Sequence, residues 1–145
     1  MNNSPRLPAY RTILNIANAY VAIEKTFERE LFGFGLSMEQ WDILRQLNDR
    51  PGASGAEIAR QTRVSPQAVA TMLQRLEKAE LVTRRSAERG RAIEAYLTTK
   101  GEELLAHGER IATRVEAQVF STFTPEERAQ FNDFLVRCVE NFDES

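Results

Sequence analysis

The 145-residue chain contains one cysteine, one histidine and no long apolar run, and each shortage excludes a class of protein. Cys138 alone cannot form an intrachain disulfide, and one histidine with one cysteine does not supply a tetrahedral zinc site. No stretch approaches the roughly 18 consecutive apolar residues that cross a membrane. The first residues lack the basic and apolar segments of a secretory signal. We therefore expect a cytoplasmic protein that holds no metal and does not enter a membrane.

Arrangements that support catalysis are also scarce. The serines fall at predicted helix caps or in loops, and the acidic residues lie mainly on polar helix faces. A nucleophile or general base needs a second group that holds it, and no such pairing is visible. No glycine-rich loop follows a strand, so nucleotide binding has no support. We expect no catalytic residue and no cofactor, and the chain is not predicted to be an enzyme.

The formal net charge of −2 is unevenly distributed along the chain. Residues 60–91 carry eight basic and three acidic residues, a net charge of +5. The rest of the chain carries 11 basic and 18 acidic residues, a net charge of −7. A basic third in an acidic protein is either a solvated surface or a binding surface for an anionic partner.

Apolar residues at helical spacing predict helices through most of the chain. The first helix is expected at about 9–32, and the last two at about 99–122 and 125–142. Four helix starts show the capping-box pattern, in which Ser or Thr is followed three residues later by Glu or Gln. These starts are Ser37, Ser54, Thr99 and Thr124. Ser65 followed by Pro66 is a further cap, with proline at the first helical position.

Two short β-compatible runs interrupt the helices. The runs LVTRR (81–85) and AIEAYL (92–97) are joined by the polar segment SAERGR, which has a glycine near its tip. This pattern is typical of a β-hairpin. The predicted fold class is therefore mainly α with a small β-hairpin, in the order four helices, hairpin, two helices.

The helix that starts at Ser65 has two distinct faces. On a helical wheel, Met72, Leu73 and Leu76 lie within about 60° of Val69. The opposite face presents polar side chains from Gln67, Thr71, Gln74, Arg75 and Lys78. A short helix precedes it by a tight turn, and the pair followed by the hairpin predicts a winged helix-turn-helix. Gln and Thr on the exposed face are residues that read base edges in the major groove of DNA.

At this point the sequence resembles the MarR family of bacterial transcription regulators. The resemblance runs through LSMEQWDIL, GAEIARQTRVSPQAVATMLQRLEKAELVTRR and GRAIEAYLTTKGEELL, about residues 36–105. It implies a winged helix-turn-helix DNA-binding domain at 36–98 and a helical dimerisation domain from 1–35 and 99–145. It also implies a homodimer that binds double-stranded DNA at a palindromic operator, usually as a repressor released by a small aromatic effector.

The chain departs from the family pattern at two positions. The family's wing commonly carries Asp-x-Arg at its tip, and Arg91 falls on the Arg, whereas Arg89 occupies the position of the Asp. Glu88 is then the candidate to brace Arg91. Thr71 stands where members often carry Arg on the recognition helix.

Two sets of site residues follow. The DNA-binding residues are predicted to be Ser65, Gln67, Ala68, Thr71, Gln74, Arg75, Arg84, Arg89 and Arg91. Because the family's effector cleft borders the helix that carries Trp41, the effector-binding candidates are Trp41, Arg45 and His107.

Alternative interpretations remain open for single residues and for the module. Trp41 is also interpreted as a core residue, and His107 as a structural histidine. Cys138 is interpreted as a small buried hydrophobic residue in preference to a redox sensor. A winged helix used for protein contact is the alternative function, but such interfaces centre on apolar or aromatic anchors rather than on a polar, basic face.

Overall fold

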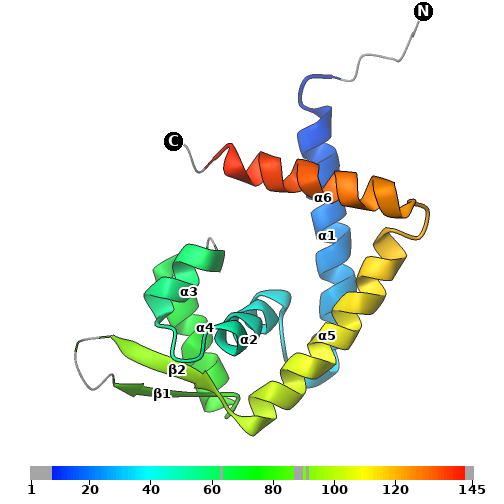
Figure 1. Ribbon diagram of the computed structural model, residues 1–145. Helices are drawn as coiled ribbons and strands as arrows, with labels where there is room; N and C mark the ends of the chain where they lie inside the picture. Colours follow the sequence, from blue (N-terminus) through cyan, green and yellow to red (C-terminus); the bar gives the residue numbers. More distant parts are fainter. Residues whose placement is uncertain (1–7, 63, 87–89, 91, 143–145) are drawn as a thin grey trace, which may run out of the picture. The chain divides into compact units, whose positions relative to one another are not determined.

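The protein was analysed as a computed structural model that describes residues 8–62, 64–86, 90 and 92–142. Six α-helices and a two-stranded antiparallel wing follow one another in the predicted order, so the predicted fold class is confirmed (Figure 1). The elements are α1 (Arg11–Leu31), the 3₁₀ turn η1 (Phe32–Phe34), α2 (Met38–Asp49), α3 (Gly55–Thr62), α4 (Pro66–Lys78), β1 (Val82–Ser86), β2 (Ile93–Leu97), α5 (Thr99–Val119) and α6 (Pro125–Glu140).

The chain forms two compact units, Met1–Ala112 and Thr113–Ser145. The first contains the helix-turn-helix, its wing and α1, and the second contains the end of α5 and all of α6. No helix in the described part of the chain has the length and apolar character needed to cross a membrane.

Side-chain caps start several helices as predicted. Ser37 Oγ accepts from the backbone N–H of Gln40 at 3.1 Å, and Gln40 Oε1 accepts from the Ser37 N–H at 3.1 Å. Ser54 and Thr124 form the same reciprocal capping box with the glutamate three residues on. These caps satisfy backbone N–H groups that have no partner within the first helical turn.

The predicted cap at Thr99 is wrong by one residue. Thr98 Oγ1 accepts from the backbone N–H of Gly101 at 3.0 Å, and Thr99 is the first residue of α5. The Thr98 N–H donates to the Leu81 carbonyl at 3.1 Å, so pairing at the end of the wing places Thr98 at the helix entrance. Two adjacent threonines offer the same local cap, and a contact distant in sequence selects between them.

The core of the first unit lies between α2, α3 and α4. Leu44 and Leu47 of α2 are fully buried, as are Ile58 of α3 and Val69 of α4, while Leu73 is 3% exposed. The apolar stripe predicted for α4 therefore faces inward. In an amphipathic helix the apolar and polar residues lie on opposite faces. Burial of the apolar stripe of α4 therefore leaves its polar face exposed to solvent.

The wing is attached to the core through the loop between α2 and α3. The two strands pair antiparallel, with Val82 opposite Leu97 and Ser86 opposite Ile93. The Gly52 N–H donates to the Ala95 carbonyl at 2.9 Å, and the Ala95 N–H donates to the Ala53 carbonyl at 3.2 Å. The loop thus forms an isolated β-bridge beside the middle of β2 and ties the hairpin to the core.

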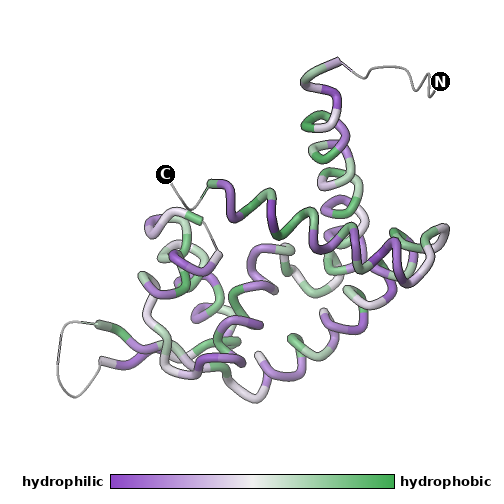
Figure 2. The backbone as a smooth tube through the Cα atoms, turned by 45° about the horizontal axis from the view of Figure 1, so that its top comes forward, coloured by the Kyte–Doolittle hydropathy of each residue, from purple (hydrophilic) through white to green (hydrophobic). Residues whose placement is uncertain are grey.

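Large apolar faces of α1 and α6 are exposed in the single chain. Figure 2 shows hydrophobic and hydrophilic residues alternating along both helices. In α6 no residue is buried, and Cys138 is exposed, so its interpretation as a buried residue is wrong for the single chain. The exposed apolar side chains are Ile13, Leu14, Ile16, Tyr20 and Val21 on α1, and Phe131, Phe134, Val136 and Val139 on α6.

Helix α5 packs closely against α2 at a glycine. The buried positions of α5 include Leu105, Gly108 and Ile111, whereas Leu104 is half-buried. A Cβ added at Gly108 would overlap Cδ1 and Nε1 of Trp41 and would lie 3.1 Å from its Cγ. The absence of a side chain at Gly108 therefore lets the indole lie directly on α5.

We expect Gly108→Ala to lower the free energy of unfolding by about 1–3 kcal/mol, because the added methyl overlaps a ring that is held in the core. The matched control is Gly33→Ala, where no atom lies within 4 Å of the added Cβ. Urea denaturation followed by circular dichroism at one fixed protein concentration measures both. Replacing Trp41 by Leu in the Gly108→Ala variant should reduce the loss. Equal effects at the two glycines would contradict this contact.

Candidate nucleic-acid interface and ligand site

The exposed face of α4 is polar and carries most of the predicted DNA-binding residues. Ser65 caps the helix by accepting from the backbone N–H of Ala68 at 3.2 Å, and Pro66 occupies the first turn. Ala68 is half-buried. The side chains that stand fully outward are Gln67, Thr71, Gln74 and Arg75.

Local hydrogen bonds leave this face able to read bases. The Thr71 side chain is exposed, and its hydroxyl donates to the Gln67 carbonyl at 3.1 Å. A base amino group can still donate to that oxygen, and the methyl can contact thymine. Gln67, one turn earlier near the helix N-terminus, can form a bidentate pair with adenine.

Arg84, one of the predicted DNA-binding residues, has its guanidinium engaged by another side chain. It lies on β1 and donates to Oε1 of Glu77, on α4, at 3.0 Å. The Arg84 side chain is only 23% exposed, against 42% for Glu77. The hydrogen bond from Arg84 lowers the pKa of the Glu77 carboxyl. This ion pair ties the wing to the last turns of the recognition helix.

A second group of side chains covers the face of the wing. The Arg85 guanidinium lies 4.2 Å from the centre of the Tyr96 ring, and Tyr96 donates to Glu94 Oε2 at 2.8 Å. Arg85 also lies 3.9 Å from Glu94. The predicted contacts Arg89 and Arg91, and the proposed brace Glu88, fall outside the described residues.

The three effector candidates do not line one cavity. Trp41 lines a cavity of about 390 Å³ with Tyr20 and Met72. His107 lines a different one, of about 350 Å³. The Arg45 guanidinium forms ion pairs with Asp42 at 2.9 Å and Asp49 at 3.3 Å. The sequence could not reveal this separation, because it depends on how α2 and α5 pack.

Trp41 combines features of a core residue and of a binding residue. The centroids of the Trp41 and Phe27 rings are 5.1 Å apart. The indole also packs against Gly108 of α5. Its Nε1 is buried and has no hydrogen-bond acceptor among the described residues. Burying an unpaired donor costs free energy, so an acceptor atom brought by a ligand would be stabilised there.

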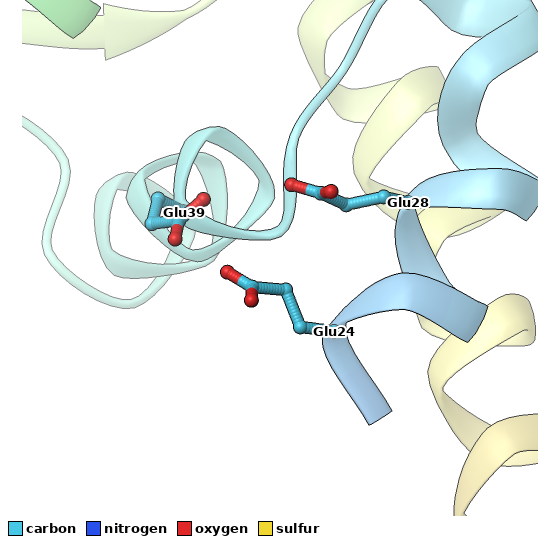
Figure 3. A group of neighbouring side chains, drawn as sticks. All are labelled: Glu24, Glu28 and Glu39. Carbon is cyan, nitrogen blue, oxygen red and sulfur yellow. The ribbon is translucent and has the colours of Figure 1, made fainter. Parts of the chain in front are cut away.

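Three carboxylates that are separated in the sequence meet where α1 faces the first turn of α2. Figure 3 shows Glu24 and Glu28 on α1 turned toward Glu39 on α2, and their oxygens lie within 4.8 Å of one another. Glu24 also accepts from the Tyr20 hydroxyl at 3.2 Å. Burial, and then the hydrogen bond to Glu24, raise the pKa of Tyr20. We assign no ligand to this cluster, because exposed acidic groups commonly gather without one.

The amino-acid sequence was compared with protein-family models and with known proteins. A protein-family model described as "MarR family" matches residues 34–92. The HTH-type transcriptional repressor Rv2887 of Mycobacterium tuberculosis is 36% identical over 102 residues, which are 70% of this chain and 73% of that protein.

Solved structures extend the likeness over nearly the full chain. The crystal structure of M. tuberculosis MarR family protein Rv2887 in complex with DNA is 27% identical, with a TM-score of 0.72, and covers 91% of this chain and 98% of that one. Its complex with salicylic acid is 28% identical, with a TM-score of 0.69, and covers 92% and 98%. A MarR transcriptional regulator from Methanosarcina mazei, 20% identical with a TM-score of 0.85, covers 95% and 93% and shares the fold.

The ion pair between Glu77 and Arg84 is predicted to make the stability of the fold depend on pH. The pKa of Glu77 is lower in the folded protein than its usual value of 4.5, so the pair stabilises the fold above pH 4.5. That contribution is lost as the pH falls through the lower, folded-state pKa. Glu77→Gln should therefore lower the unfolding midpoint temperature at pH 7, and the difference from wild type should shrink as the pH falls below 4.5 toward pH 3.

Scanning calorimetry at both pH values makes this measurement. Glu140→Gln, which removes the same charge from α6, is the control. A loss in the Glu77→Gln variant that persists unchanged at pH 3 would show that packing, rather than the charge, is responsible.

Proposed function

The chain belongs to the MarR family, and from this premise we propose that it is a DNA-binding transcriptional repressor. We propose further that it binds a palindromic operator as a homodimer and leaves it when a small aromatic acid binds. The observation that carries the proposal is the outward polar face of α4. Gln67, Thr71 and Arg75 stand exposed on a helix whose other face is buried. Such a helix fits the major groove, where amide and hydroxyl groups read base edges.

The second copy is inferred from the apolar faces of α1 and α6. On α6, Phe131 is 37% exposed and Phe134, three residues further on the same face, is 48% exposed. Patches of this kind in a water-soluble chain mark interaction sites. A homodimer that covers them presents two recognition helices, and on a palindromic operator these enter successive major grooves about 34 Å apart.

Basic side chains supply the affinity that is independent of sequence. Arg75, Lys78 and Arg85 are exposed on α4 and β1. Contacts from such residues to phosphates set the position of the protein on the duplex and make binding salt-dependent. We propose that Arg89 and Arg91 add a contact at the wing tip, and that Arg84 acts mainly through Glu77 by holding the wing beside α4.

Release by an aromatic acid is supported by the relative whose structure contains salicylic acid. A ligand can favour a spacing of the two recognition helices that does not match the operator. It then lowers the affinity for DNA, and the size of this effect is set by how much more tightly the ligand binds that spacing than the DNA-binding one. The cavity that Trp41 lines and the separate cavity that His107 lines are the places where we propose that this chain contacts such a ligand.

The proposed reading of DNA is tested by comparing two positions on α4. Gln67→Ala should relax the preference at one base pair of each half-site, because a bidentate glutamine–adenine pair contributes about 1–3 kcal/mol of discrimination. Arg75→Ala should weaken all sites almost equally, because it lies two turns further along and is placed for a phosphate. Selection from random DNA with each variant measures this. A changed motif with Arg75→Ala and an intact one with Gln67→Ala would reverse the assignment.

The dimer is tested on α6 without truncating the chain. Phe134→Glu places a charge in the proposed interface and should convert dimers into monomers, seen by analytical ultracentrifugation, with loss of operator binding. Asn132→Glu, at an exposed polar position of the same helix, is the matched control. A wild-type protein that sediments as a folded monomer and still binds a palindromic site tightly would exclude the homodimer.

A further inference from the structure

We propose that Thr71 selects thymine in the operator, by packing its methyl group against the 5-methyl group of that base. The inference rests on the proposed function, because it assigns one base and one chemical group to a position of the recognition helix. Thr71 is exposed on α4, one turn beyond Gln67. Its side chain carries two different groups, a hydroxyl and a methyl, and the structure separates what each can do at a base edge.

The hydroxyl proton of Thr71 is already used within the helix. Oγ1 donates to the Gln67 carbonyl at 3.1 Å. A hydroxyl has one proton and two lone pairs, so this oxygen can accept a further hydrogen bond but has no second proton to donate. In the major groove guanine presents only acceptors, N7 and O6, whereas adenine and cytosine each present an amino group. Guanine therefore gains no hydrogen bond from Thr71.

The same hydrogen bond sets the direction of the methyl group. Threonine in a helix populates two χ1 rotamers, since its Oγ1 can bond a carbonyl of the preceding turn. The bond from Thr71 to the Gln67 carbonyl selects one rotamer, and this choice fixes the direction of Cγ2. A methyl group that is already held in one rotamer loses little conformational entropy on binding. Its apolar counterpart on a base edge in the major groove is the thymine 5-methyl group.

The residues around Thr71 leave guanine without its usual reader. Residues 65–74 include no charged side chain, so these turns of α4 provide no arginine or lysine for a bidentate pair with guanine. Gln67 is suited to adenine. Ala70, exposed next to Thr71, adds a second small apolar group. The first turns of the helix are therefore suited to A·T pairs, and Thr71 supplies the contact to the thymine.

Helix stability does not account for threonine at this position. Threonine is a weaker helix former than alanine, and a hydroxyl bonded to the carbonyl four residues earlier slightly destabilises a helix. Because Thr71 is exposed, its side chain adds nothing to the core of the first unit. The side chain is available to a base edge.

The test removes single methyl groups from the operator that the wild-type protein recovers from random DNA. Each thymine is replaced in turn by deoxyuridine, which lacks only the 5-methyl group. Fluorescence anisotropy at one fixed salt concentration measures the dissociation constant. At one thymine of each half-site the replacement should raise Kd about fourfold, the effect of exposing one methyl-sized apolar group. Cytosine and 5-methylcytosine at that position, each opposite guanine, should differ by the same factor in favour of the methylated base.

Two variants separate the methyl group from the hydroxyl. Thr71→Ser keeps the hydroxyl, and it should weaken the unmodified operator about fourfold per half-site and abolish the response to deoxyuridine. Thr71→Val keeps a methyl group and should retain the response. Thr26→Ser on α1 is the matched control, because Thr26 makes the same type of bond, to the Ala22 carbonyl at 2.8 Å. It should leave the response unchanged, and circular dichroism confirms that each variant is folded.

The results distinguish a failure of this inference from a failure of the proposed function. A palindromic site that no deoxyuridine weakens, a response that Thr71→Ser retains, or one that Thr71→Val loses would overturn methyl reading and leave the operator proposal standing. Equal binding of cytosine and 5-methylcytosine would also overturn it. If the recovered site is not palindromic but contains a thymine whose response depends on Thr71, methyl reading stands and the palindromic operator is excluded. If no sequence is enriched, both proposals fail.

Discussion

Burial of the apolar stripe of α4 is the interaction on which the rest of the structure depends. Val69, Leu73 and Leu76 are almost fully buried against the core of the first unit. Because these residues occupy one side of the helix, their burial fixes the rotation of α4 about its own axis. This rotation alone places the side chains of Gln67, Thr71 and Arg75 on the opposite, exposed side of the helix. A rotation that exposed Leu73 would remove a buried leucine from the core, which costs about 1.5–3 kcal/mol. The surface proposed to read DNA is thus held in place by the hydrophobic effect on the opposite face of α4.

The three residues after α4 join the elements that surround this helix. Glu80 has a positive φ of 62°, a conformation that non-glycine residues adopt at a cost of roughly 1–2 kcal/mol. Its carbonyl accepts from the Thr98 hydroxyl at 2.7 Å, and the Leu81 N–H donates to the Leu76 carbonyl at 2.9 Å. The wing, the end of the recognition helix and the start of α5 therefore share one junction. The ion pair of Glu77 with Arg84 and the hydrogen bond from Lys100 to the Ala79 carbonyl also lie at this junction.

The sequence correctly predicts those features that depend only on residues close together along the chain. The caps at Ser37, Ser54, Ser65 and Thr124 need only a hydroxyl and a backbone N–H three residues later, so the spacing predicts them. The cap of α5 was misplaced, because the choice between Thr98 and Thr99 depends on a hydrogen bond to Leu81. The sequence places Arg84 among the predicted DNA contacts. Its ion pair with Glu77 joins two elements, and only their packing reveals it.

By itself, the sequence determined the order of the helices and the hairpin, the two faces of α4 and the likeness to the MarR family, because periodicity, capping and motif spacing are local properties. The tertiary structure decided which polar residues meet. It separated Trp41, Arg45 and His107, gathered Glu24, Glu28 and Glu39 across α1 and α2, and placed His107 beside Phe34. Such contacts depend on the distance and rotation between packed helices. Those quantities are set by side chains far apart in the sequence, such as Trp41 resting on Gly108.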